Sequence, residues 1–232
     1  MSPPLFLVDE LPSGDRFTLA GAEGHHAANV QRITTGEALL LCDGRGGLAR
    51  GVVLAAHKGA LDLALDPAEH VPPADPSITV VQGIAKGERG ELAVQLLTEV
   101  GADRIVPWQA ARSVARWRDA KPLERWRSTA REAVKQSRRP WLPEVTEARS
   151  TRQLALTGTV LVLHEEASEP LSAVTLPATG EITLVVGPEG GVAPEELASI
   201  GGTPVRLGRE VLRTSTAGAA AVSALSVRLG RW

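Results

Sequence analysis

Short apolar runs recur along the first 70 residues of the chain, and turn-forming residues such as Pro12-Ser13-Gly14 separate them. The runs cover residues 5–8, 16–21, 37–44, 51–56 and 60–66. Short strands at even spacing predict a β-barrel or a β-sandwich. Residues 23–32 are the exception and predict a short helix.

A proline-rich segment, VPPADPS, follows at residues 71–77. Pro72, Pro73 and Pro76 stiffen this segment, and they are incompatible with a helix or a central strand. We therefore predict that it links two domains, residues 1–72 and residues 77–232.

Beyond this linker, unbroken apolar runs alternate with helical patterns. The runs at residues 78–84, 104–108, 160–165, 182–187 and 204–208 predict strands, and residues 88–100, 122–137, 194–200 and 214–229 predict helices. Strands that are apolar throughout are typical of a parallel sheet with helices on both faces. The second part of the chain is therefore predicted to be an α/β domain.

The bulk composition is that of an ordinary soluble protein, with 43% hydrophobic and 22% charged residues. No apolar run approaches the roughly 18 residues that a membrane-spanning helix needs, and the N-terminus lacks the pattern of a signal peptide. Cys42 is the only cysteine, and no Cys/His cluster has the spacing of a zinc site. We therefore expect a cytoplasmic protein without a metal.

Charge is distributed unevenly along the chain, although the net charge is only −2. Residues 104–152 hold 13 Lys/Arg against 5 Asp/Glu, whereas residues 153–203 hold no Lys/Arg and 7 Asp/Glu. This asymmetry indicates either a surface that binds a polyanion or a solvated amphipathic helix. Tryptophans lie among the arginines and could stack on a nucleobase or belong to the core: Trp108, Trp117, Trp126 and Trp141.

Three loops that follow predicted strands are the main candidates for chemistry. They are LHEEA at residues 163–167, GPEGG at 187–191 and LGREVLRTSTA at 207–217. In doubly wound sheets, ligands bind beyond the carboxyl ends of the strands, and glycine lets the backbone approach a ligand closely. The loops contain neither a Walker A motif nor GxGxxG. They predict a ligand without a triphosphate that is held mostly by backbone groups.

Each loop also has a purely structural interpretation. GPEGG could be only a tight turn, residues 214–217 could only cap the following helix, and His164 could be a packed core residue. The functional interpretation gains weight because three such loops follow strands of one sheet.

The motifs VLVLHEE, LVVGPEGG and VRLGREVLRTSTA, in this order, resemble the cofactor-binding motifs of SPOUT methyltransferases. More narrowly, the chain resembles the ribosomal small-subunit methyltransferase E family. Earlier segments resemble that family too, namely HHAANVQRITTGEALLLCDG, KGERGELAVQLLTEVGADRIVPWQAARSV and REAVKQSRRPWLPEV. The resemblance covers nearly the whole chain, and GPEGG with LGxxxLRT is its most specific part.

This resemblance implies a PUA-like β-barrel followed by an α/β domain with a deep trefoil knot, a rare exception to the rule that chains are unknotted. It also implies a homodimer, the cofactor S-adenosyl-L-methionine and methylation of N3 of a uridine in 16S ribosomal RNA, within an assembled or nearly assembled small ribosomal subunit.

The chemistry of this reaction and the resemblance together indicate which residues form the site, because the uridine N3 must lose its proton during attack. Arg112 and Arg213 would stabilise the charge that develops on the uridine, although they could equally bind phosphate or pair with a carboxylate such as Glu189. His164 or Glu165 could serve as base. The residues expected to contact the cofactor are Leu163, His164, Glu165, Gly187, Pro188, Glu189, Gly190, Gly191, Leu207, Gly208, Val211, Leu212, Thr216 and Ala217. Those expected to contact RNA are His25, His26, Arg32, Lys86, Arg89, Arg116, Arg138 and Arg139.

Two positions depart from the family pattern. Ser215 stands where the family usually has an acidic residue, and Leu96 stands where a lysine is common. These departures leave two alternatives open: a SPOUT enzyme that acts on another RNA atom, such as a ribose 2′-hydroxyl of transfer RNA, or a non-enzymatic RNA-binding or ribosome-assembly factor. A hydrolase is disfavoured because no G-x-S-x-G motif is present.

Overall fold

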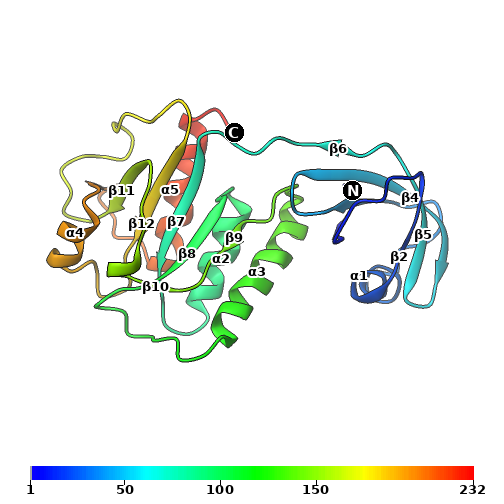
Figure 1. The fold of residues 1–232 in the computed structure, drawn as a ribbon, viewed down its shortest axis with the longest axis horizontal. Coiled ribbons are helices and arrows are strands. Elements are labelled where there is room, and N and C mark those ends of the chain that lie inside the picture. Colours follow the sequence, from blue (N-terminus) through cyan, green and yellow to red (C-terminus); the bar gives the residue numbers. More distant parts are fainter. Residues whose placement is uncertain (1) are drawn as a thin grey trace. The chain divides into compact units, whose positions relative to one another are not determined.

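The structure, a computed structural model, describes residues 2–232 and divides into two units (Figure 1). The first unit runs to Pro73 and also includes Val134–Leu142, and the second comprises Ala74–Ala133 and Pro143–Trp232. The helix α3 (Lys121–Ser137) therefore begins in the second unit and ends in the first. The hydrophobic pattern did not indicate this, because it placed all residues from 77 onward in one domain.

A six-stranded sheet forms the first unit, in the order β1-β3-β4-β5-β2 with β6 beside β4. β1 is parallel to β3, and the other pairs are antiparallel. The five predicted strands are confirmed, but β4 is longer than predicted and β6 is too short to show an alternating pattern. The strands are β1 (Leu5–Leu7), β2 (Arg16–Leu19), β3 (Ala38–Cys42), β4 (Gly47–His57), β5 (Ala60–Leu65) and β6 (Glu69–His70).

The sheet of the first unit is buried on two sides where β1 and β3 lie. On one side Phe6, Leu39 and Leu61 belong to a hydrophobic cluster. On the other side Leu5 and Cys42 belong to a second cluster that includes Val134 of α3. This double burial explains why β1 is apolar at every position.

The predicted helix at residues 23–32 begins two residues earlier, as α1 (Gly21–His25). It continues as η1 (His26–Val30), a π-helical segment, rather than as a regular α-helix. Arg32, with a left-handed φ of 55°, lies two residues beyond the end of this segment.

The second unit is built on a seven-stranded sheet in which every pair of strands is parallel, as the apolar pattern predicted. Its order is β10-β8-β7-β12-β11-β13, with β9 also paired to β8. The two-residue strands β9 and β10 were not predicted. The strands are β7 (Ser77–Gly83), β8 (Arg104–Gln109), β9 (Glu144–Val145), β10 (Arg149–Ser150), β11 (Thr159–Leu163), β12 (Glu181–Val186) and β13 (Thr203–Val205).

Helices cover both faces of this sheet. Gly218 of α5 (Thr214–Arg228) packs against Leu97 of α2 (Arg89–Glu99) and against Val186 of β12. On the other face, Val185 belongs to a cluster that Leu197 of α4 (Pro194–Ile200) joins. Because consecutive strand residues face opposite sides, both sets of side chains are buried, and the strands read as unbroken apolar runs.

Candidate functional site

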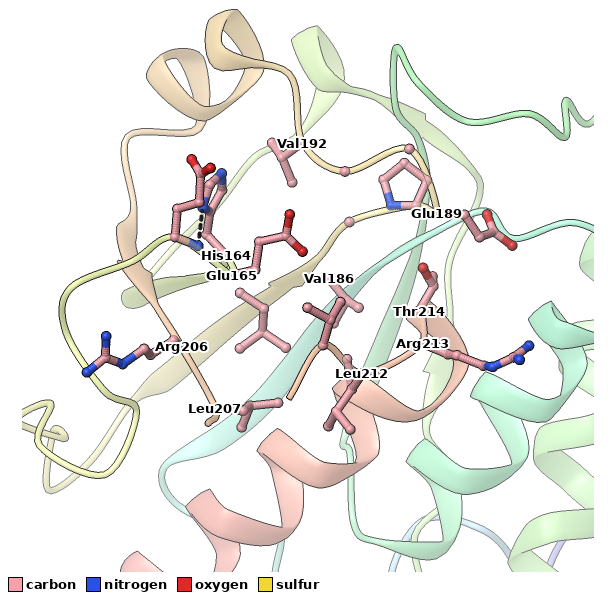
Figure 2. A pocket seen from close by; sticks show the side chains of 18 of the residues that line it. His164, Glu165, Val186, Glu189, Val192, Arg206, Leu207, Leu212, Arg213 and Thr214 are labelled. Atoms are coloured by element: carbon pink, nitrogen blue, oxygen red, sulfur yellow. Dashed lines mark hydrogen bonds between the residues drawn. The ribbon is translucent and has the colours of Figure 1, made fainter. Parts of the chain in front are cut away.

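A pocket of about 690 Å³ lies where the chain leaves β11, β12 and β13. These three strands are parallel, so their carboxyl ends lie at the same edge of the sheet. Loops from that edge, together with the start of α5, form the walls (Figure 2). The structure therefore brings the three predicted loops together around one cavity.

The first loop leaves β11 at Leu163. The backbone N–H of His164 donates to the carbonyl of Val205, 2.9 Å away, and so ties this loop to the end of β13. The N–H of Glu166 donates to Nδ1 of His164, 3.2 Å away (Figure 2). Because Nδ1 accepts this hydrogen bond, the neutral imidazole carries its proton on Nε2. His164 in this state is a hydrogen-bond donor at Nε2.

The second loop, Gly187 to Gly191, is a tight turn closed by a 2.9 Å hydrogen bond from the N–H of Gly191 to the carbonyl of Pro188. Gly191 has φ of +74°, a conformation that favours glycine. A Cβ at Gly190 would lie 2.9 Å from both Cβ and the carbonyl oxygen of Arg112. Gly190 therefore lets this loop contact the segment that carries Arg112.

The third loop runs from Leu207 to the start of α5. Within residues 2–232, no backbone N–H from Leu207 to Arg213 donates a hydrogen bond to another group of the protein. Arg213 precedes the first turn of α5, and no side chain caps that turn. Gln82, which is fully buried at the end of β7, donates to the carbonyl of Thr214 at 3.3 Å. The loop thus offers a row of N–H groups to a ligand and is anchored at its far end.

Arginine side chains line the same pocket. Arg112 reaches the carbonyl of Gly190 at 3.4 Å. Glu189 is paired with Arg89 at 3.8 Å and accepts the backbone N–H of Lys86 at 3.2 Å. Arg213 forms no ion pair within the part of the chain that the structure describes. Neither predicted catalytic arginine is therefore neutralised by Glu189.

Family models match both units. A model described as RNA methyltransferase domain matches residues 73–226, and one described as RNA methyltransferase PUA domain matches residues 19–66. Two proteins named ribosomal RNA small subunit methyltransferase E are similar over almost the whole chain. The relative from Mycobacterium bovis is 48% identical, with 98% of this chain and 93% of its own covered, and that from Bacillus subtilis is 32% identical, with 94% and 91% covered.

The chain belongs to the ribosomal RNA small subunit methyltransferase E family.

Solved structures agree with this family assignment. The ribosomal RNA small subunit methyltransferase E of Neisseria gonorrhoeae, solved bound to S-adenosyl methionine, is 28% identical with a TM-score of 0.88, and the match covers 98% of each chain. A Legionella pneumophila methyltransferase, solved in complex with the same cofactor, is 26% identical with a TM-score of 0.85 and 98% coverage of each chain. The resemblance seen in the loop motifs of the sequence is thus confirmed.

Most residues that the methyltransferase E motifs singled out lie on the pocket wall. All the predicted cofactor-binding residues line it except Thr216, whose hydroxyl donates to the carbonyl of Arg213 at 3.2 Å. Arg112, Arg213 and Arg89 line it as well. Arg206 and Glu210 also contribute to the wall and were not predicted.

The residues predicted to contact RNA are distributed over both units of the methyltransferase. His26 packs edge-on against Phe6 at a ring distance of 6.2 Å, whereas His25 is exposed and bonded to Asn29 at 2.9 Å. The first unit also holds Arg32, Arg138 and Arg139, and the second holds Lys86, Arg89 and the exposed Arg116.

The tryptophans interleaved with the arginines are mainly structural. Trp108 and Trp126 are almost completely buried. Trp117 packs edge-on against Trp126, with ring centres 5.0 Å apart. Trp141 donates its N–H to the carbonyl of Val71 at 2.9 Å. These contacts explain the tryptophans as core and anchoring residues.

Proposed function

We propose that this protein is an S-adenosyl-L-methionine-dependent methyltransferase that methylates N3 of a uridine in 16S ribosomal RNA within the small ribosomal subunit. The observation that carries this proposal is the pocket formed by the three loops, in a chain whose relatives are named ribosomal RNA small subunit methyltransferase E. Family membership supports the substrate class, and the pocket supports the cofactor.

The pocket fits such a cofactor in size and chemistry. Its volume of about 690 Å³ lies within the range of about 300–1,000 Å³ that is usual for cofactor sites. Leu163, Val186 and Leu212 supply apolar surface for a nucleobase. The unpaired N–H groups between Leu207 and Arg213 supply donors for its polar edges.

The cofactor would be held by the second and third loops, with Leu163 and His164 at the border. When bound, S-adenosyl-L-methionine supplies an electrophilic methyl group. The protein's task is then to place the uridine and to lower the cost of losing its N3 proton.

Arg112 and Arg213 would stabilise the negative charge that develops on the uracil ring, because both are permanently charged and both line the pocket. His164 is a donor at Nε2 in its neutral form, since Nδ1 is already an acceptor. Glu165, on the same wall, is therefore the better candidate to accept the proton.

The basic residues of each unit would bind RNA phosphates. In the second unit Lys86, Arg89 and Arg116 are exposed near the carboxyl edge of the sheet or in the loop that follows β8. In the first unit Arg32, Arg138 and Arg139 supply charge, and His25 is exposed. Such contacts position RNA without reading its sequence, which favours a folded subunit over free RNA as the substrate.

Finer features of the fold belong to the same proposal. We infer a PUA-like barrel for residues 1–72, supported by the PUA model match, and a SPOUT domain with a trefoil knot for residues 77–232, supported by the RNA methyltransferase match. A homodimer is proposed because Leu92 of α2 and Val227 of α5 expose apolar side chains. No helix of residues 2–232 is long and apolar enough to cross a membrane, and the substrate places the enzyme in the cytoplasm.

The test is methyl transfer to small ribosomal subunits from a strain that lacks the family enzyme. Purified protein, tritiated S-adenosyl-L-methionine and subunits are incubated, and label in the RNA is counted against naked 16S RNA and transfer RNA. The proposal expects label in subunit RNA and loss of transfer in Arg112→Ala and Arg213→Ala. Label in transfer RNA alone would favour the alternative target. Subunit binding without transfer, with no cofactor binding by calorimetry, would favour a non-enzymatic assembly factor.

A further inference from the structure

Glu196 is a carboxylate buried inside the second unit, at the third position of α4. Only 5% of the residue is exposed. Its Oε1 accepts the backbone N–H of Ala111 at 2.9 Å and the hydroxyl of Thr151 at 2.5 Å. Its Oε2 accepts the N–H of Ala193 at 3.4 Å. One side chain thus joins three segments that are far apart in the sequence.

No cation of residues 2–232 neutralises this carboxylate. Within residues 2–232, Glu196 takes part in no ion pair, so its charge is met by N–H and O–H donors alone. Burying a charge without a counter-ion is unfavourable for stability. Glu196 closes a capping box at the start of α4 by accepting the N–H of Ala193, a role that glutamine can also fill. Its hydrogen bonds to Ala111 and Thr151 go beyond that capping role.

The hydrogen bonds to Glu196 fix the point where β8 ends. Trp108, the fully buried residue near the end of β8, donates its indole N–H to the hydroxyl of Thr151 at 3.1 Å. Thr151 in turn donates to Glu196, and Glu196 holds Ala111. The chain from Trp108 to Ala111 is therefore anchored at both ends through one buried network.

The residue after Ala111 is Arg112, one of the two proposed catalytic arginines. The exposed side chain of Arg112 has one long hydrogen bond, to the carbonyl of Gly190. Its backbone contacts Gly190 so closely that a Cβ there would lie 2.9 Å from its carbonyl oxygen. The placement of Arg112 thus depends on its backbone rather than on its own polar contacts.

We propose that Glu196 is a positioning residue, which holds the Arg112 loop in register with the GPEGG loop and so aims Arg112 into the pocket. This inference rests on the proposed methyltransferase function. It adds a role for a side chain that is not on the pocket wall and that the sequence motifs did not single out. One carboxylate oxygen of Glu196 accepts the N–H of Ala111, and the other accepts the N–H of Ala193, the N-cap residue of α4. Glu196 thereby holds the two segments together.

The test compares Glu196→Gln with a matched control, Glu181→Gln. Glu181 also accepts hydrogen bonds from two threonines, Thr79 at 2.5 Å and Thr157, but it lies at the amino end of β12, away from the pocket. Both variants replace a carboxylate by an amide within the second unit. At Glu196 the amide turns one acceptor into a donor, which cannot satisfy Ala111, Thr151 and Ala193 together.

We expect Glu196→Gln to lower kcat for RNA methylation by roughly 10- to 100-fold, because a displaced catalytic group loses rate steeply with distance. The Kd for S-adenosyl-L-methionine, measured by calorimetry, should stay within about twofold of wild type, since Glu196 does not line the pocket. Glu181→Gln should keep the wild-type kcat. Arg112→Ala should lower kcat strongly in the wild-type protein but by less than about twofold in the Glu196→Gln protein, because residues that act through one another are not additive.

The outcomes separate this inference from the proposed function. If wild-type protein transfers no methyl group, the proposed function fails first. If wild-type protein does transfer the methyl group, the inference is overturned when Glu196→Gln and Glu181→Gln have the same kcat. An Arg112→Ala effect of equal size in both backgrounds also overturns it. Should Glu196→Gln fail to fold in a thermal unfolding assay, Glu196→Asp takes its place, because it keeps the charge but its shorter side chain draws the carboxylate back from the N–H of Ala111. A Glu196→Asp protein with wild-type kcat would then overturn the inference.

Discussion

Gly190 leaves no room for a side chain at the contact between two loops of the pocket. A Cβ at Gly190 would lie 2.9 Å from the Cβ of Arg112 and 2.9 Å from the carbonyl oxygen of Arg112. The carbonyl oxygen is part of the backbone, and the Cβ is bonded directly to it. Neither atom can move away by a simple side-chain rotation. Replacing Gly190 by alanine must therefore push the GPEGG loop and the Arg112 segment apart.

The size of the effect follows from the cost of overpacking. Forcing an extra methyl group into a tight contact costs about 1–3 kcal/mol. Without the cofactor the exposed loop can relax outward, whereas with the cofactor it must return to its bound position. If that cost falls on binding, the Kd for S-adenosyl-L-methionine rises by roughly 5- to 140-fold, at about 1.4 kcal/mol for each factor of ten.

Isothermal titration calorimetry of Gly190→Ala against wild type measures this change. Gly201→Ala is the matched control, because Gly201 ends α4 with φ of +68° and has nothing within 4 Å of the new Cβ. The control should lose about 1–2 kcal/mol of stability through backbone strain alone and keep its affinity for the cofactor. A Gly190→Ala protein whose Kd stays within about twofold of wild type would refute the reasoning.

Three further predictions concern other parts of the protein. Burial raises the pKa of the Cys42 thiol, so a thiol reagent at neutral pH should label the protein only after denaturation; rapid labelling of the native protein would contradict this. Hydrogen bonds from Thr18 and then His57 hold the pKa of Asp62 below its ordinary value of 3.8, so the contribution of Asp62 to stability is present above that pH and is lost as the pH falls through the lower folded pKa. In urea unfolding, Asp62→Asn should be less stable than wild type at pH 7 and as stable as wild type in strong acid. An equal stability difference at both pH values would contradict this prediction. Leu225 is fully buried in α5, so Leu225→Ala should lower the free energy of unfolding by about 2–5 kcal/mol in the same assay. A decrease of less than about 1 kcal/mol would contradict the close packing of this face of α5.

The strands and helices of the second unit could be predicted because burial on both faces leaves a simple pattern. β12 is buried at five consecutive positions, so its sequence is apolar without interruption. The position of the pocket could be predicted for a related reason: parallel strands end at one edge, and the loops beyond that edge are polar and rich in glycine. Only the resemblance to a family, however, led from those loops to a cofactor and a reaction.

Other features left no signal in the sequence. β6, β9 and β10 have two residues each, which is too short for any periodicity. Val134–Leu142 joins the first unit through packing that no local pattern records. Glu196 looks like an ordinary acidic residue in the first turn of a helix, and its burial depends on segments 45 and 85 residues away. Local sequence cannot reveal such contacts, because they arise only when the sheet assembles.

Tertiary packing also overrode a local expectation in the first unit. Residues 23–32 were predicted to form a short helix, yet the second half of that segment is π-helical and ends at Val30. Arg32, two residues later, has a left-handed φ. Ala27 is fully buried in the core of this unit, and the edge contact of His26 with Phe6 lies beside it. The wider turn thus accompanies the packing of this segment onto the sheet.

The most direct test of the central claim is the identity of the methylated nucleoside. Small ribosomal subunits from a strain without the family enzyme are incubated with the protein and S-adenosyl-L-methionine that carries a deuterated methyl group. The 16S RNA is then digested to nucleosides for chromatography and mass spectrometry. The account predicts 3-methyluridine with the deuterated methyl group on the base. A 2′-O-methylated nucleoside, or no deuterated nucleoside at all, would contradict it.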